Sequence, residues 1–314
     1  MPVLGRLFDM DIFSTIIPIF AVILLGWVSR KRGFIHADFI GPANSLVFYI
    51  AIPAMIFRAI SRASLTAHFS AGILVITLSV AIIGFILAWL FGYACHLKQG
   101  QLGSYVQTSF HGNLGYIGLA VVFYYLGEDG LVKASILTGF LMIVQNLLSV
   151  LSLTFNAKSD STGNGQTVLR NLAGNPVILS AMAGIFCSSL KVPIPLIAQR
   201  SLDILSGLAL PMALLIIGAS ISFQEIRHKL KWVLSSSITK LALMPGLGYL
   251  TFRVLGFSAV DYLPGLILLA SPTATISYVM AKEMKGDPDF AVIAISFSTL
   301  LSALTFTFWL NVAV

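Results

Sequence analysis

Long apolar segments joined by short polar connections follow one another along the whole chain of 314 residues. A helix that spans a bilayer needs about 20 mainly apolar residues. The segments that meet this condition are residues 12–29, 43–61, 70–94, 103–126, 131–155, 171–190, 197–221, 231–254, 262–282 and 290–312. The pattern therefore predicts an all-α integral membrane protein with ten transmembrane helices.

Lysines and arginines are unevenly shared between the two sides of these segments. Most of them lie in the connections that follow the odd-numbered segments, beginning with Arg30, Lys31 and Arg32. Basic connections stay on the cytoplasmic side. We therefore expect a multi-pass protein of the cell membrane, with both termini outside and the central connection in the cytoplasm.

The longest polar connection, residues 156–170, lies near the midpoint of the chain. It separates an N-terminal repeat, residues 1–155, from a C-terminal repeat, residues 171–314. Because each half has an odd number of helices, the halves enter the membrane from opposite sides. Two such halves with a common fold form an inverted repeat, which is typical of secondary transporters. Together they make one membrane domain, with a short cytoplasmic loop between them.

The fourth and ninth segments are interrupted by residues that weaken a helix. Segment 103–126 contains the run His111-Gly112-Asn113-Leu114-Gly115, and segment 262–282 contains Ser271-Pro272-Thr273-Ala274-Thr275. Glycine destabilises a helix by about 1 kcal/mol relative to alanine, and proline removes a backbone donor. Close packing of small residues explains the glycines alone equally well. Matched interruptions in both halves instead indicate a substrate site.

If the two broken helices cross at the bilayer midplane, four half-helix ends meet there. Helix N-termini present free N–H groups and partial positive charge, which favour an anion. Neutral side chains and backbone groups of both interruptions, with two amides of the fifth segment, are the candidate ligands of a carboxylate. The predicted substrate-binding residues are Asn113, Gly112, Gly115, Asn146, Gln145, Ser271, Pro272, Thr273 and Thr275.

Two ionisable residues near the middle of spans are candidates for a coupling or charge role. His111 can titrate near neutral pH, although a lone histidine is more often a packing residue. Lys240 lies centrally in the eighth segment, although its long stem can also carry the ammonium to the cytoplasmic side. Neither interrupted segment contains Asp or Glu, so nothing there indicates a carboxylate relay for protons or sodium.

Composition narrows the class of protein further. The chain is 57% hydrophobic and 10% charged, with a net charge of +7. Its basic residues lie mainly at helix ends, which indicates a lipid bilayer and not nucleic acid as the partner. Cys95 and Cys187 offer neither metal-ligand spacing nor a disulfide framework. The five histidines are scattered. We therefore expect no enzyme activity, no metal site and no cofactor, with coupling to H⁺ or Na⁺ left open.

Motifs in order along the chain resemble the auxin efflux carrier family, whose bacterial members are described as organic-acid permeases. They are Ile17-Pro18-Ile19-Phe20 with Leu25-Gly26, Val47-Phe48-Tyr49-Ile50-Ala51-Ile52-Pro53-Ala54, Gly112-Asn113-Leu114-Gly115-Tyr116-Ile117-Gly118-Leu119, and Pro272-Thr273-Ala274 through Ser277-Tyr278-Val279-Met280-Ala281. The resemblance covers essentially the whole chain.

This resemblance implies the fold of bile-acid sodium symporters and sodium/proton antiporters, in which helices four and nine are broken and cross. It implies a transport domain, and a scaffold of helices one, two, six and seven that forms a homodimer. Asn113 matches an asparagine that helps to bind the indole acid in plant members, and Asn146 is the candidate for a second one. The short central loop is typical of prokaryotic members and a bacterial inner membrane.

The function we predict is secondary transport of a small organic anion by an elevator mechanism. The anion is a mono- or dicarboxylate, auxin-like or like malonate or malate. Two alternatives on the same fold are an ion-conducting channel and a cation-coupled transporter of a different solute. Saturable flux with counterflow separates a carrier from a channel.

Overall fold

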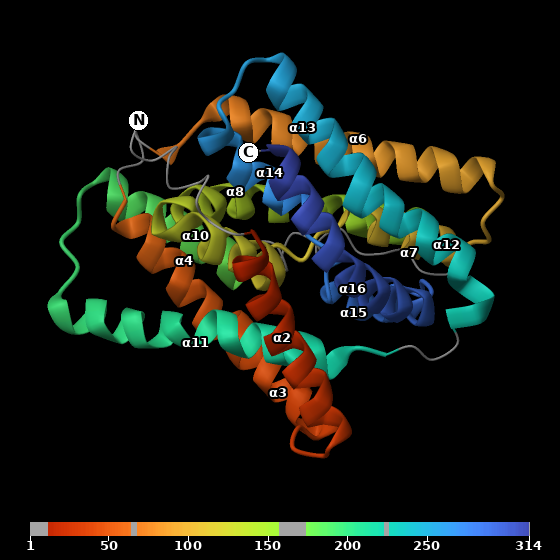
Figure 1. The fold of residues 1–314 in the computed structure, drawn as a ribbon, viewed down its shortest axis with the longest axis horizontal. Helices are drawn as coiled ribbons and strands as arrows, with labels where there is room; N and C mark the ends of the chain where they lie inside the picture. Colours follow the sequence, from red (N-terminus) through yellow and green to blue (C-terminus); the bar gives the residue numbers. More distant parts are fainter. Residues whose placement is uncertain (1–11, 64–67, 157–173, 223–225, 314) are drawn as a thin grey trace.

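The computed structural model describes residues 12–63, 68–156, 174–222 and 226–313, and within them the regular elements are helices (Figure 1). The predicted central loop, residues 156–170, lies almost wholly outside these ranges. The helices in chain order are α2 (Ile12–Lys31), α3 (Ala37–Leu46), η1 (Val47–Ala51), α4 (Ile52–Ser61), α6 (Ala71–Ala94), α7 (Gln101–Phe110), η2 (Leu114–Gly118), α8 (Leu119–Phe155), α10 (Pro176–Ser189), α11 (Leu196–Ser220), α12 (Ile226–Ile238), η3 (Thr239–Leu243), α13 (Met244–Val254), α14 (Ala259–Ala270), α15 (Ile276–Glu283) and α16 (Pro288–Ala313).

Six helices of the described chain are long and apolar enough to cross a membrane. They are Ile12–Lys31, Ala37–Ser61, Ala71–Ala94, Leu114–Phe155, Leu196–Ser220 and Pro288–Ala313. Two shorter apolar helices are Pro176–Ser189 and Ala259–Ala270. Several other predicted spans are divided by breaks, so each piece is too short to cross alone. The structure thus supports a multi-pass membrane protein, while the number of ten spans stays a prediction.

The fourth and fifth predicted spans are joined by continuous helix and not by a separate turn. Helix continues from Leu114 to Phe155, 42 residues in all. Such a length corresponds to about 60 Å if straight, twice the hydrocarbon core of about 30 Å. Gly127, with φ 70° and ψ −160°, interrupts the helical backbone inside α8. Because glycine has no Cβ, it adopts this conformation readily, and the chain reverses there through a kink.

Two π-helical turns precede prolines and have a common cause. The turn η1 leads into α4, whose second residue is Pro53, and η3 leads into α13, whose second residue is Pro245. Proline lacks the N–H that would bond four residues back. The backbone accommodates the missing bond by widening into a π turn, a feature frequent at functional sites.

The helices pack as two groups, which Figure 1 shows at lower left and upper right. In the first group α2 packs extensively on α11, and α4 packs on both α10 and α11. The second group contains α6, α7, η2, α8 and the helices from α12 to α16. Gly26 and Gly218 allow α2 and α11 to approach closely, since an added Cβ at either would overlap backbone atoms of the other helix. Small residues commonly permit such contacts between membrane helices.

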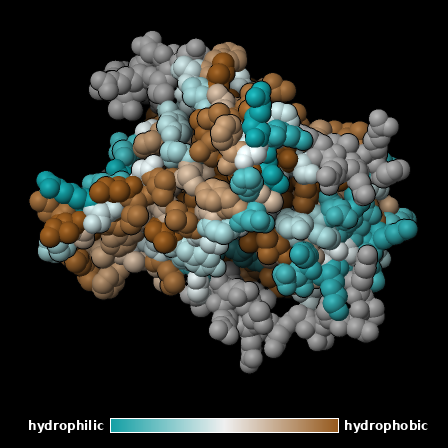
Figure 2. All heavy atoms as spheres, turned by 90° about the horizontal axis from the view of Figure 1, so that it is seen from below, coloured by the Kyte–Doolittle hydropathy of each residue, from teal (hydrophilic) through white to brown (hydrophobic). Residues whose placement is uncertain are grey.

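Much of the surface is apolar. Phe34, Ile197 and Ile204 are 84%, 82% and 77% exposed, and Figure 2 shows broad hydrophobic areas on the face seen from below. Soluble monomers rarely expose large contiguous apolar patches. This surface is therefore suited to contact with lipid chains.

Candidate functional site

Both predicted interruptions are present, and they meet inside the protein. The first separates α7 from η2, and the second separates α14 from α15. Gly112 and Thr273 form an antiparallel β-bridge. The N–H of Asn113 donates to the carbonyl of Pro272 at 2.7 Å, and the N–H of Ala274 donates to the carbonyl of His111 at 2.9 Å. Each break thus satisfies backbone groups of the other, which would otherwise cost several kcal/mol each at membrane depth.

A cavity of about 570 Å³ lies beside the bridge, within the usual size range of small-molecule sites. The first helix group forms one wall through α3, η1, α4, α10 and α11. The second group forms the other wall through the two breaks, α8, α15 and α16. Residues that line the cavity include Gly41, Asn44, Ser45, Tyr49, His111, Gly112, Asn113, Leu114, Gly115, Tyr116, Ser220, Thr275 and Tyr278. It therefore separates the two groups at the level of the breaks.

The polar lining of the cavity suits an anion although no lysine or arginine lines it among the described residues. Helix N-termini at Leu114 and Ile276 both reach the cavity, and a helix N-terminus carries partial positive charge. Asn113 is 5% exposed, and its Nδ2 has no hydrogen-bond partner in the part of the chain that the structure describes. A buried donor without an acceptor is costly. A carboxylate oxygen would supply that acceptor.

The predicted substrate residues divide into two sets. Gly112, Asn113, Gly115 and Thr275 line the cavity, and so does His111. Ser271, Pro272 and Thr273 are buried and are not part of the lining. The hydroxyl of Ser271 donates to the carbonyl of Ile267 at 3.0 Å, and that of Thr273 donates to the carbonyl of Thr108 at 2.9 Å. These two hydrogen bonds stabilise the backbone around the second break.

The two amides of α8 also lie outside the cavity lining. Gln145 is buried, and its Nε2 donates to the carbonyl of Phe110 at 3.3 Å, which satisfies the end of α7. Asn146 is half-buried. His111, although it lines the cavity, forms a 2.8 Å hydrogen bond through Nδ1 with Ser149 of α8. The contacts of Gln145 and His111 hold α7 against α8.

Sequence reasoning missed polar residues of the first helix group. The hydroxyl of Tyr116 donates to Oδ1 of Asn44 at 2.6 Å, and both residues line the cavity together with Ser45. Asn44 and Ser45 stand in the first turn of a predicted span, and polar residues within a span are a signal of function. Because polar residues are common at the ends of membrane helices, Asn44 and Ser45 did not stand out in the sequence.

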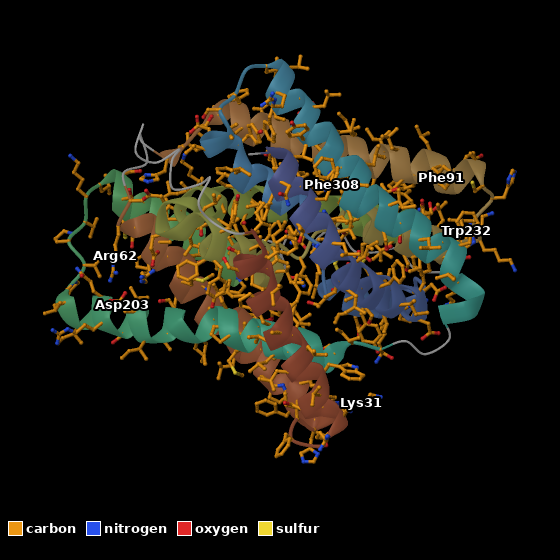
Figure 3. All side chains as sticks on the ribbon, viewed as in Figure 1. Lys31, Arg62, Phe91, Asp203, Trp232 and Phe308 are labelled. Atoms are coloured by element: carbon orange, nitrogen blue, oxygen red, sulfur yellow. The ribbon has the colours of Figure 1, made fainter. Side chains whose placement is uncertain are left out.

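An ion-pair cluster joins the two groups at the C-terminal end of α4, and its members are Arg58, Arg62, Glu128 and Asp203. Arg58 donates to both carboxylate oxygens of Glu128, at 3.0 and 3.2 Å, and to Asp203 at 2.7 Å. Arg62 donates to Asp203 at 2.9 Å. Figure 3 shows Arg62 and Asp203 facing each other where α4 and α11 approach. The cluster connects α4 and α11 to the kink of α8.

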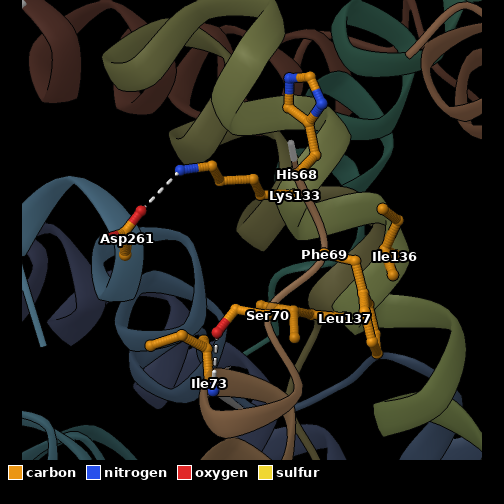
Figure 4. Close-up of a pocket in the computed structure, with 8 residues that line it drawn as sticks. All are labelled: His68, Phe69, Ser70, Ile73, Lys133, Ile136, Leu137 and Asp261. Carbon is orange, nitrogen blue, oxygen red and sulfur yellow. Dashed lines mark hydrogen bonds and ion pairs between the residues drawn. The ribbon is translucent and has the colours of Figure 1, made fainter. Parts of the chain in front are cut away.

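A second cavity lies near the N-terminal end of α6, and Figure 4 shows its lining. Its volume of about 40 Å³ is room for only a few water molecules. Lys133 and Asp261 form a 3.1 Å ion pair at its edge. The cavity is too small for an organic acid, and we assign it no solute.

Groups of three or more His, Cys, Asp or Glu that could hold a metal ion are not found among the described residues. The two cysteines are free, with Cys95 exposed and Cys187 partly buried. The chemistry of the site is therefore that of neutral donors and helix ends.

Apolar membrane-crossing helices, paired backbone breaks and a cavity between two helix groups together define a membrane transporter. The profile of the membrane transport protein family matches residues 11–310, and the chain belongs to this family, the auxin efflux carriers that its motifs resemble. A protein of Rhizobium meliloti named putative malonate transporter is 25% identical over 303 residues, covering 95% of this chain and 94% of that protein.

Two uncharacterised transporters are similar over the same extent. One, from Methanocaldococcus jannaschii, is 24% identical over 303 residues, covering 94% of this chain and 97% of its own. The other, YfdV of Escherichia coli K12, is 22% identical over 310 residues, covering 95% and 96%. Similarity thus extends over nearly all of each chain, including both breaks.

Proposed function

We propose that this chain is a secondary transporter of a small organic anion, with a dicarboxylate such as malonate as the first candidate. The observation that carries the proposal is Asn113, which lines a cavity of about 570 Å³ and whose buried Nδ2 has no acceptor among the described residues. Two helix N-termini add positive potential to the same space. The name of the Rhizobium meliloti relative supports malonate as the acid to try first.

The proposed topology is a ten-helix inverted repeat in which the two broken helices cross at the bilayer midplane. Its support is the bridge between Gly112 and Thr273, which joins interruptions from opposite halves. Under the positive-inside rule, both termini face outward. The cavity then opens toward the cytoplasm, because its lining includes the first turns of α3 and the last turn of α11. The membrane we propose is a bacterial inner membrane.

The proposed mechanism is an elevator movement of the second helix group, with its two breaks, against the first. Its support is the packing of the helices as two groups with the cavity between them. A homodimer through α2, α4, α10 and α11 is part of the same proposal. It is supported by exposed apolar residues of α11 such as Ile197 and Ile204.

Binding of carboxylates to purified protein, followed by uptake into proteoliposomes, tests the proposal. Asn113→Ala removes a hydrogen bond to a charged acceptor, which is worth about 1.5–3 kcal/mol. We expect malonate affinity to fall about 10- to 100-fold. Asn311→Ala is the matched control, because this exposed amide near the end of α16 donates to the carbonyl of Thr307 in its own helix. This variant should change affinity less than about twofold.

Counterflow measurements complete the test. A carrier preloaded with unlabelled malonate accumulates labelled malonate transiently, whereas a channel does not. Unchanged transport of every accepted acid by the Asn113→Ala variant would falsify the site. Flux without saturation or counterflow would instead favour the channel alternative.

A further inference from the structure

Lys240 lies in the π turn η3 at the middle of its predicted span, and its side chain is fully buried. Charged groups away from water are costly unless they are paired. Lysine stems in membrane helices usually carry the charge to an interface. The π turn widens the helix just before Pro245, and the side chain of Lys240 runs inward from within this turn. The groups that contact the buried ammonium of Lys240 must therefore stabilise it.

The ammonium group lies at the C-terminal end of α14. Its Nζ donates to the carbonyl of Leu269, one of the last carbonyls of that helix, which have no intrahelical donors. The C-terminus of a helix carries partial negative charge that a cation stabilises. Among the residues that the structure describes, no carboxylate forms an ion pair with Lys240. The helix end is thus its counter-charge.

Gly112 separates this ammonium from the cavity. A Cβ added at Gly112 would lie 3.1 Å from Cε and 3.2 Å from Nζ of Lys240, so the lysine packs directly against the backbone of the break. The same residue lines the cavity. Gly112 therefore touches both the buried lysine and the proposed anion site, which places Nζ one residue away from that site. Low local polarity screens such a charge poorly.

We propose that Lys240 is a fixed internal cation of the transporter. It neutralises the C-terminal end of α14 at the breaks and adds positive potential to the cavity through Gly112. Because the cation is covalently part of the chain, anion binding requires no dissociable metal cation at the breaks. This inference rests on the proposed function, and Lys240 is a positioning residue because it acts on the solute through the backbone.

The experiment compares malonate affinity in the wild type, Lys240→Met and Lys231→Met, each in sodium chloride and in choline chloride. Methionine keeps most of the volume and removes the charge. Lys231 is an exposed lysine of the preceding helix, over the ring of Trp232, and serves as the control. We expect Lys240→Met to lose at least about tenfold in malonate affinity, Lys231→Met less than twofold, and the wild type to bind equally in both salts.

Affinity for uncharged malonamide is measured in parallel, because a purely structural role of Lys240 would lower it together with malonate affinity. Unchanged malonate affinity in Lys240→Met, or an equal loss for both compounds, overturns the inference. A requirement of the wild type for sodium also overturns it, and this result decides the matter if Lys240→Met does not fold. Absence of any carboxylate binding by the wild type refutes the proposed function itself, a distinguishable outcome.

Discussion

The ion-pair cluster at the far end of α4 should control how often the transporter opens on that side. Arg58 belongs to the first helix group and Glu128 to the second. The cavity lining lies away from the cluster and includes Gly41, Asn44 and Ser45 of α3, where the proposed cytoplasmic opening lies. Opening on the side of the cluster requires the groups to separate there, which breaks the contacts between Arg58 and Glu128. The perturbation is Glu128→Gln, which keeps the shape of the side chain and removes its charge.

The geometry sets the size of the effect. The Arg58 side chain is 20% exposed and that of Glu128 is 55% exposed, so water screens the pair. Such pairs contribute about 0.2–1 kcal/mol, and two-point contact places this one near the upper end. About 1 kcal/mol corresponds to a change of about fivefold in the ratio of two states. Glu128→Gln should therefore raise the population open on the cluster side about fivefold.

Cysteine labelling in proteoliposomes measures that population. The reporter is Thr275→Cys, which lines the cavity, in a background where Cys95 and Cys187 are replaced by serine. An impermeant maleimide is added from the cluster side, and its reaction rate follows the fraction of time that the site faces that side. The matched control is Asp129→Asn, the next residue, whose side chain is 92% exposed and which should change the rate less than about 1.5-fold. A rate in Glu128→Gln equal to that of the control would refute the reasoning.

Two further predictions concern stability and the contact between the groups. Gly218→Ala should lower the free energy of unfolding by about 1–3 kcal/mol, because the new Cβ overlaps backbone of α2 and no side-chain rotation relieves it. The control is Gly207→Ala in the same helix, where nothing lies within 4 Å of an added Cβ. In thermal unfolding in detergent, this control should be neutral or stabilising. Equal melting temperatures of the two variants would contradict this packing. Tyr116→Phe removes the 2.6 Å hydrogen bond to Asn44 and should cost about 0.5–1.5 kcal/mol. A double-mutant cycle with Asn44→Ala measures the coupling, and a coupling energy of zero would exclude this bond as a link between the groups.

The breaks could be located from the sequence because their cause is local. Glycines around Asn113 and the missing donor of Pro272 weaken any helix that contains them. Their placement opposite each other in the two halves then predicted that they meet. The sequence could not predict which side chains near the bridge line the cavity and which are buried in the protein.

Directions of long side chains depend on tertiary packing. Lys240 and Arg58 both have stems that reach either an interface or the interior, and nothing in the neighbouring residues decides between them. Packing against Gly112 determines the first, and the carboxylates of Glu128 and Asp203 determine the second. The cavity lining on α3 was missed for a related reason. Asn44 could not be recognised because its hydrogen-bond partner, Tyr116, is far away in the sequence.

The bridge between the breaks also constrains the order in which the chain can assemble. His111 and Asn113 are synthesised early, yet their backbone partners, Ala274 and Pro272, belong to the other half of the chain. Until those residues arrive, a carbonyl and an N–H in the first half lack protein partners, at several kcal/mol each in hydrocarbon. The first half therefore cannot complete its own break. During biosynthesis, the candidate site is complete only when Pro272 and Ala274 have been made and packed against it, so a truncated chain lacks the site as well as the missing helices.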